Sequence, residues 1–151
     1  WMPAFLGSLL VVPLVLIGNS LKQPIVGIIA GFLAPITWSY YNRTMTGYYD
    51  TDMLTIVLPT FIVWGIISSL INKENRFLLI APIFTILYLF WYQQGSSLSL
   101  GLAGMLFLYT VIFERKEIYN YKLLSFIFIA LAPVSALIKL PILLIAFGVI
   151  Y

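Results

Sequence analysis

Residues 42–52 have the sequence Asn42-Arg43-Thr44-Met45-Thr46-Gly47-Tyr48-Tyr49-Asp50-Thr51-Asp52, and they separate two long apolar segments, residues 24–41 and 53–71. Each segment is close to the roughly 20 residues that a helix needs to cross a bilayer. The pattern predicts a polar loop at a membrane surface that carries two acidic side chains and one arginine. Ionisable groups beside a membrane-spanning segment are costly to desolvate, so this loop is the first candidate for a functional site.

The composition of the chain supports a membrane protein. Of the 151 residues, 62% are hydrophobic and 9% are charged, whereas soluble domains carry about 25% charged residues. The mean hydropathy is +1.06. We therefore predict an all-α fold, a polytopic bundle of transmembrane helices.

Seven apolar segments follow one another along the chain. The predicted spans cover residues 3–21, 24–41, 53–71, 77–92, 98–113, 123–138 and 141–151. Because Pro133 interrupts the sixth, the last two are either two short spans or one broken helix. We expect about six to seven spans that form part of one transmembrane domain over residues 1–151. Since both ends of the chain are apolar, we also expect an internal fragment of a larger membrane protein.

Prolines and glycines within the spans predict local features of the bundle. Proline removes a backbone donor and kinks a helix. The prolines within or near the spans are Pro13, Pro35, Pro59, Pro82 and Pro133. Gly27 and Gly31 are four residues apart, a spacing that lets a second helix approach closely.

The basic residues predict the orientation of the bundle. If the spans alternate, six of the eight basic residues fall in connections on one side, and only Arg43 and Lys139 fall on the other. The six are Lys22, Lys73, Arg76, Arg115, Lys116 and Lys122. The positive-inside rule places these six on the cytoplasmic face. The predicted protein is thus a multi-pass protein of the cell inner membrane whose 42–52 loop faces the periplasm or a lumen, and residues 114–122 form a solvated cytoplasmic turn.

Asp50 and Asp52 are candidate metal ligands. In an extended backbone their carboxylates project to the same side and can share one hard cation such as Mn²⁺ or Mg²⁺, with water, phosphate or other carboxylates completing the shell. Arg43 can hold a phosphate oxygen or keep the acids ionised. The alternative is that Asp50 or Asp52 only caps a helix that begins at Met53. The chain has no cysteine and no histidine, so its chemistry must use carboxylates, hydroxyls, arginine or lysine.

Residues 39–54, Ser39-Tyr40-Tyr41 through Asp52-Met53-Leu54, closely resemble the second acidic motif in the catalytic subunit of asparagine-linked oligosaccharyltransferases, above all the bacterial single-subunit type. The similarity covers nearly the whole chain. It includes residues 9–13, residues 24–34, the Ile56-Val57-Leu58-Pro59 stretch, the Leu89-Phe90-Trp91-Tyr92 stretch and the Phe113-Glu114-Arg115-Lys116-Glu117 turn.

The resemblance implies roles for five residues. Asp50 and Asp52 correspond to the metal-site acids of the family, and Arg43 corresponds to the neighbouring basic residue that supports the site. Trp91 and Tyr92 fall on the family's Trp-Trp-Tyr-Pro stretch near the lipid-linked donor. This chain departs from that stretch, because Phe90 replaces the first tryptophan and Gln93 replaces the proline.

The activity implied by the resemblance is that of a glycosyltransferase. The family enzyme transfers an oligosaccharide from a polyprenyl pyrophosphate carrier to asparagine in an N-x-S/T sequon of an acceptor polypeptide. Its first-loop acid, its later-loop glutamate and the Trp-Trp-Asp motif of its soluble C-terminal domain are not in this sequence. The 151 residues alone are therefore expected to be inactive.

Two other readings of the sequence remain open. A transporter or channel fragment could use Asp50 and Asp52 to attract cations to an outer vestibule, although that class usually places its essential charges near the bilayer midplane. A different polyprenyl-dependent glycosyltransferase could transfer sugar to lipid or to serine or threonine. Nucleic acid is not an expected partner, because the formal charge of +3 arises from only eight basic and five acidic residues.

Overall fold

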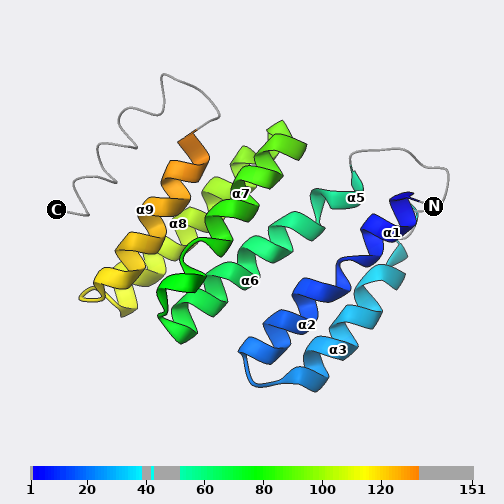
Figure 1. The fold of residues 1–151 in the computed structure, drawn as a ribbon, viewed down its shortest axis with the longest axis horizontal. Coiled ribbons are helices and arrows are strands. Elements are labelled where there is room, and N and C mark those ends of the chain that lie inside the picture. The colour runs from blue at the N-terminus through cyan, green and yellow to red at the C-terminus, as the bar shows by residue number, and fades with distance from the viewer. Residues whose placement is uncertain (1, 39–41, 43–51, 133–151) are drawn as a thin grey trace.

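The computed structural model describes residues 2–38, 42 and 52–132 (Figure 1). Every regular element in these ranges is a helix, which confirms the predicted all-α class for this part of the chain. In chain order the elements are α1 (Met2–Ser8), α2 (Val11–Ser20), α3 (Pro24–Leu33), η1 (Ala34–Ile36), α5 (Asp52–Thr55), α6 (Val57–Asn72), η2 (Asn75–Phe77), α7 (Ile80–Trp91), η3 (Gln93–Gly95), α8 (Ser96–Phe113) and α9 (Ile118–Leu131).

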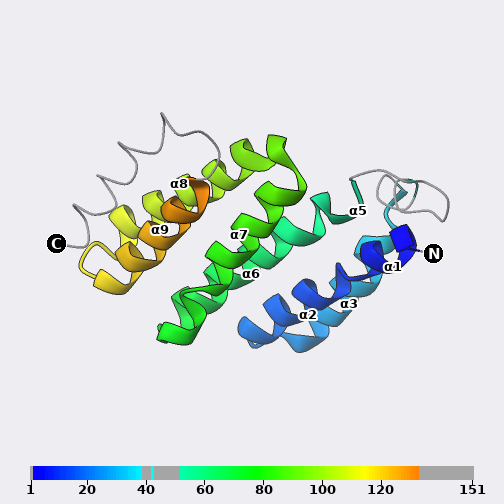
Figure 2. The ribbon, with the colours of Figure 1, turned by 45° about the horizontal axis from the view of Figure 1, so that its top comes forward.

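The longer helices form antiparallel hairpins that lie side by side. Figures 1 and 2 show the pair α2–α3, then α6–α7, then α8–α9, and contacts of α2 with α6 and of α7 with α9 join the pairs. The main core lies between α6, α7, α8 and α9. Its buried apolar residues are Leu58, Ile62, Leu78, Ala81, Tyr88, Ala103, Leu106, Leu123, Leu124 and Ile127.

Prolines account for the interruptions of the helices. Pro13 lies four residues after Leu9, where α1 gives way to α2, and Pro59 lies four residues after Thr55, where α5 gives way to α6. A proline ring crowds the carbonyl four residues before it and offers no N–H to that carbonyl. Pro82 is the third residue of α7 and follows the break after η2 in the same way. The predicted kinks are thus confirmed at these three positions, and Pro133 lies outside the described residues.

Glycines allow α2 and α3 to pack closely. A Cβ atom placed on Gly18 would lie 2.5 Å from the Cα atom of Gly27, and one placed on Gly31 would lie 3.1 Å from Cγ1 of Val11. The predicted close helix contact at Gly27 and Gly31 is confirmed, and its partner helix is α2. Small residues of this kind let two helix backbones approach without side chains between them.

The outer surface of the bundle is strongly apolar, whereas several of its buried residues are polar. Ile25 and Ile36 are each 71% exposed, while Thr85 and Thr110 are fully buried. Each threonine hydroxyl donates to the carbonyl four residues earlier in its own helix, at 2.8 Å. Apolar faces turned outward and small polar residues between helices are typical of bundles packed within lipid.

One helix in the described part of the chain, Ser96–Phe113, is long and apolar enough to cross a membrane, with 18 residues and a mean hydropathy of 1.8. The other apolar helical segments are shorter, between 10 and 17 residues. The number of spans, six to seven, therefore stays a prediction. The last predicted span, 141–151, lies outside the described residues.

Two predicted boundaries are wrong. Residues 114–122 were expected to form a solvated turn and residue 123 to begin the next span, but α9 begins at Ile118. The side chain of Asn120 is fully buried and donates a hydrogen bond to Glu114. A hydropathy pattern predicts that a polar residue such as Asn120 is exposed. A polar group that is hydrogen-bonded can nevertheless be packed inside the protein. Lys122 consequently lies on the exposed side of α9 and not in a connection.

The turns that carry the basic residues lie at the same end of the bundle, along its lower and left edge in Figure 1. The hydroxyls of Ser20 and Ser68 lie 3.0 Å apart and join the ends of α2 and α6. The hydroxyl of Tyr119, at the start of α9, donates to the carbonyl oxygen of Glu74 at 2.7 Å. We call this the basic end. The structure thereby confirms that the three connections predicted to share a side do so.

Candidate functional site

Asp52 lies at the other end of the bundle, opposite the basic end. It is the first residue of α5, one residue earlier than predicted, and α5 contacts α1, α6 and α7. Arg43 and Asp50 lie outside the described residues, and so does the side chain of Asp52. Within the described residues no group of three or more acidic side chains is placed to hold a metal ion. The metal site and the helix cap therefore both stay predictions.

Trp91 and Tyr92, the predicted donor-binding residues, lie at the C-terminal end of α7. Trp91 is the last residue of that helix and is 37% exposed, and the preceding Phe90 is 89% exposed. Because α5 contacts α7, the helix that begins at Asp52 and the helix that ends in these aromatic rings belong to the same end of the bundle (Figure 1). The structure thus brings two of the predicted site elements to one side.

The backbone of Tyr92 is fixed from both sides. Its N–H donates to the carbonyl of Tyr88 at 2.8 Å, and its own carbonyl accepts a hydrogen bond from the N–H of Gly95 at 2.9 Å. The residue itself is extended, with φ −137° and ψ 96°. The chain therefore leaves α7 at Tyr92 and enters α8 through the single turn η3.

The ring of Tyr92 is half-buried and packs on the main core. Its centroid lies 6.2 Å from that of Tyr88, with the two planes inclined by 38°. The hydroxyl reaches the exposed side of the turn, where it donates a hydrogen bond to Oε1 of Gln94 at 3.1 Å. Tyr92 thus presents a polar tip from an anchored ring.

Gly95 is required by the packing of this turn. A Cβ atom at Gly95 would lie 2.4 Å from Cε1 and 2.6 Å from Cζ of the Tyr88 ring. Real Cβ atoms do not come so close, and Tyr88 is only 2% exposed, so its ring has little room to move. The closely packed turn does not depend on the proline that the family resemblance led us to expect at position 93.

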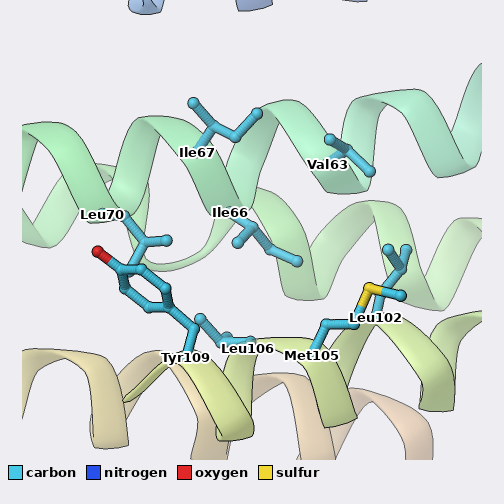
Figure 3. A pocket seen from close by; sticks show the side chains of 8 residues that line it. All are labelled: Val63, Ile66, Ile67, Leu70, Leu102, Met105, Leu106 and Tyr109. Atoms are coloured by element: carbon cyan, nitrogen blue, oxygen red, sulfur yellow. The ribbon is translucent and has the colours of Figure 1, made fainter. Parts of the chain in front are cut away.

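A shallow apolar groove of about 180 Å³ lies between α6 and α8 (Figure 3). It is lined by Val63, Ile66, Ile67, Leu70, Leu102, Met105, Leu106 and Tyr109. The hydroxyl of Tyr109 is its polar feature and donates to Oε1 of Glu114 at 3.3 Å. The groove occupies the halves of α6 and α8 that lead towards the basic end, so it does not belong to the Asp52 end of the bundle.

The basic end is held together by a network of charges. Lys73 Nζ lies 3.2 Å from Oε2 of Glu114 and 3.4 Å from Oε2 of Glu117, and Asn120 Nδ2 donates to Oε2 of Glu114 at 2.8 Å. The hydrogen bond from Asn120, and then the one from Lys73, lower the pKa of Glu114. The hydrogen bond to Glu114 is the main cause that raises the pKa of Lys73. This network is structural, since it ties the end of α6 to the turn between α8 and α9.

Sequence comparison assigns the chain to a family. The family described as "Oligosaccharyl transferase STT3, N-terminal" matches residues 1–150. The chain belongs to this family. The resemblance inferred from the Asp50 to Asp52 motif is thereby confirmed at the level of the family.

The relatives of the chain carry names of the same kind. A Campylobacter jejuni protein named "Undecaprenyl-diphosphooligosaccharide--protein glycotransferase" is 46% identical over 117 residues, which are 78% of this chain and 16% of that protein. A Methanococcus voltae protein named "Dolichyl-phosphooligosaccharide-protein glycotransferase" is 33% identical over 79 residues, 51% of this chain and 9% of that protein. The chain thus spans about a sixth of the length of the Campylobacter relative.

Sequence reasoning missed two features, one in the site region and one at the basic end. The pairing of Gln94 with Tyr92 was not predicted, although the unusual Gln93-Gln94-Gly95 turn was the signal that could have drawn attention to it. The bond of Lys73 to Glu114 was missed as well. Its signal was the presence of opposite charges in two connections that were predicted to share one side.

Proposed function

We propose that this chain is part of a membrane oligosaccharyltransferase, which transfers a glycan from a polyprenyl pyrophosphate carrier to asparagine in N-x-S/T sequons. The single observation that carries the proposal is the match of residues 1–150 to the STT3 family. The printed names of the relatives describe lipid-linked oligosaccharide donors and protein acceptors, which supports the same substrate class for this chain.

The proposed protein is a multi-pass protein of the inner membrane. The apolar helices α6 and α9 contact α8, the helix that is long enough to span a bilayer, and α2, α3 and α7 belong to the same bundle. Helices broken by proline can still cross a membrane, because neighbouring helices satisfy the freed carbonyls. With the basic end in the cytoplasm, the Asp52 end faces the periplasm or a lumen.

Asp50 and Asp52 are the proposed ligands of a divalent cation, Mn²⁺ or Mg²⁺. Their carboxylates are the ligand type that these hard cations prefer, and the chain offers no histidine or cysteine that would favour a softer metal. When bound, the cation would polarise and orient the acceptor amide. Because two carboxylates do not fill an octahedral shell, water, phosphate or carboxylates from elsewhere would complete it. The 151 residues alone should transfer no glycan.

Arg43 is the basic residue proposed to support the site from the same loop. A guanidinium is always charged and can bind a phosphate or carboxylate oxygen through two parallel N–H groups. In this role Arg43 would hold an anionic group of the donor or keep Asp50 and Asp52 ionised. It would not itself exchange a proton, because the pKa of arginine lies above the range in which enzymes work.

Trp91 and Tyr92 are the proposed donor-binding residues. Both are at the end of α7 that shares a side with the first turn of α5. An aromatic ring with a polar tip suits a ligand with an apolar carrier and a polar sugar, because such rings lie readily at the membrane interface. The exposed Phe90 would extend this apolar surface.

An acceptor assay tests the proposed function and separates it from the alternatives. The full-length protein that carries this chain should transfer glycan from a polyprenyl pyrophosphate donor to a peptide with an N-x-S/T sequon, and not to a matched peptide with glutamine in place of the asparagine. Transfer only to lipid, or only to serine or threonine, would favour the other glycosyltransferase class. Cation flux into liposomes without any glycan transfer would favour the transporter class.

A further inference from the structure

The structure offers a positioning device at the turn between α7 and α8. The ring of Tyr92 is held by Tyr88 and the core, while its hydroxyl bonds to Gln94, two residues later. Gly95 then passes directly beneath the Tyr88 ring. Tyr88, Gln94 and Gly95 therefore hold the ring, the hydroxyl and the backbone of Tyr92.

The direction of the hydrogen bond decides what Tyr92 can recognise. A phenol has one proton, and here that proton is donated to Oε1 of Gln94 at 3.1 Å. The lone pairs of the hydroxyl oxygen remain able to accept a hydrogen bond. A partner that accepts only, such as an oxygen of a pyrophosphate, would have to displace Gln94 from this proton. A sugar hydroxyl or the N–H of an acetamido group can donate to the lone pairs while the bond to Gln94 stays in place.

We propose that Gln94 is a positioning residue that fixes the hydroxyl of Tyr92 as an acceptor for a hydroxyl or N–H group of the lipid-linked saccharide. This inference rests on the proposed function, because it needs a saccharide donor. It goes further in separating the recognition of the sugar, through Tyr92, from the recognition of the pyrophosphate, which other residues must provide.

A double-mutant cycle in the full-length protein tests the proposal, with Gln94→Met, Tyr92→Phe and the double variant. Methionine is close to glutamine in length and flexibility but cannot accept this hydrogen bond strongly. We expect Gln94→Met to raise KM for the lipid-linked donor by about fivefold, the size expected for one neutral hydrogen bond. Because the contact binds substrate and transition state alike, kcat and KM for the acceptor peptide should stay unchanged.

The cycle also shows whether Gln94 acts through Tyr92. In the Tyr92→Phe background, Gln94→Met should have no further effect, because the hydroxyl that it positions is gone. Ser97→Ala, an exposed neighbour at the start of α8, is the matched control and should leave KM for the donor unchanged. Thermal melting of each variant reports whether it folds as the unmodified protein does.

A competitor that lacks sugar distinguishes recognition of the saccharide from recognition of the pyrophosphate and its polyprenyl tail. The inhibition constant of polyprenyl pyrophosphate, used as a competitive inhibitor, should be the same for the unmodified protein and for both single variants. An increase in that constant equal to the increase in KM would place the contact on the pyrophosphate or the tail and overturn the proposal. The proposal would also be overturned if Gln94→Met raised KM for the donor equally in the unmodified protein and in the Tyr92→Phe background. If the unmodified protein transfers no glycan at all, the proposed function fails and this inference with it.

Discussion

Lys73 Nζ lies 3.2 Å from Oε2 of Glu114, so the last turn of α6 is tied to the last turn of α8 across the basic end of the bundle. Lys73 itself has φ 51°, a left-handed conformation that ends α6 and turns the chain towards η2. The acidic partner is further bonded by the buried Asn120. The Glu114 carboxylate, at the end of α8, thus bonds to residues of both α6 and α9.

The bonds made by the Glu114 carboxylate predict that the stability of the protein depends on pH. The pKa of Glu114 is lowered from its ordinary value of 4.5. Such a group contributes stability above its unfolded pKa and loses that contribution as the pH falls through its folded pKa. The melting temperature of the purified chain in detergent should therefore fall between about pH 6 and about pH 3 more steeply than that of Glu114→Gln.

The control for this measurement is Glu117→Gln. Glu117 also pairs with Lys73, at 3.4 Å, but its side chain is more exposed, 48% against 26% for Glu114. Solvent weakens exposed ion pairs, so this variant should keep most of the pH dependence. Identical slopes for the unmodified chain and Glu114→Gln would contradict the role given to Glu114.

The close contact of Gly18 with Gly27, between α2 and α3, predicts that one added methyl group lowers the stability of the protein. In Gly18→Ala the new Cβ would meet the backbone of Gly27 at 2.5 Å, so the two helices must move apart. We expect a loss of about 1–3 kcal/mol in the free energy of unfolding, as for other overpacked sites. Thermal melting in detergent measures the change.

The matched control is Gly101→Ala in α8, where a Cβ atom would meet no other atom within 4 Å. Alanine is preferred to glycine in a helix interior by roughly 0.5–1 kcal/mol, so this variant should be as stable as the unmodified chain or more so. A Gly18→Ala chain that melts at or above the temperature of Gly101→Ala would show that the close contact is not needed.

Cysteine labelling tests the topology, and the chain is well suited to it because it has no cysteine of its own. Cysteines placed at Asn75 and Lys116, both at the basic end, should react with a membrane-impermeant reagent only from the cytoplasmic side. Cysteines at Ser97 and in the 42–52 loop, for example at Thr46, should react only from the opposite side. Labelling of Asn75→Cys and Thr46→Cys from the same side would overturn the orientation.

The overall arrangement of the helices was predictable from the sequence because hydropathy, proline and basic charge each vary over whole segments. Pro13 and Pro59 mark breaks that the structure contains, and the three turns of the basic end share one side. The start of α9 was not predictable in this way. Asn120 raises the polarity of its segment, yet it is buried because Glu114 accepts its hydrogen bond, and that partnership depends on packing.

The candidate site was predictable to a smaller extent. Asp52 was identified by its spacing from Asp50, and Tyr92 by a motif resemblance. The structure assigns the first turn of α5 and the end of α7 to one end of the bundle. The bond between Tyr92 and Gln94 forms in a turn where Gly95 packs directly against the Tyr88 ring. Such a contact is set by three-dimensional packing and not by the spacing of residue types.

Asp50 and Asp52 are proposed to hold the cation that supports glycan transfer. The most direct test measures sequon-peptide glycosylation by the full-length protein and by its Asp50→Asn and Asp52→Asn variants over a range of Mn²⁺ concentrations. Both variants should insert and melt normally but lose most of their activity and respond more weakly to the metal, while Thr46→Ala in the same loop should retain full activity. Activity of both asparagine variants equal to that of the unmodified protein at limiting Mn²⁺ would show that these two carboxylates are not the metal ligands.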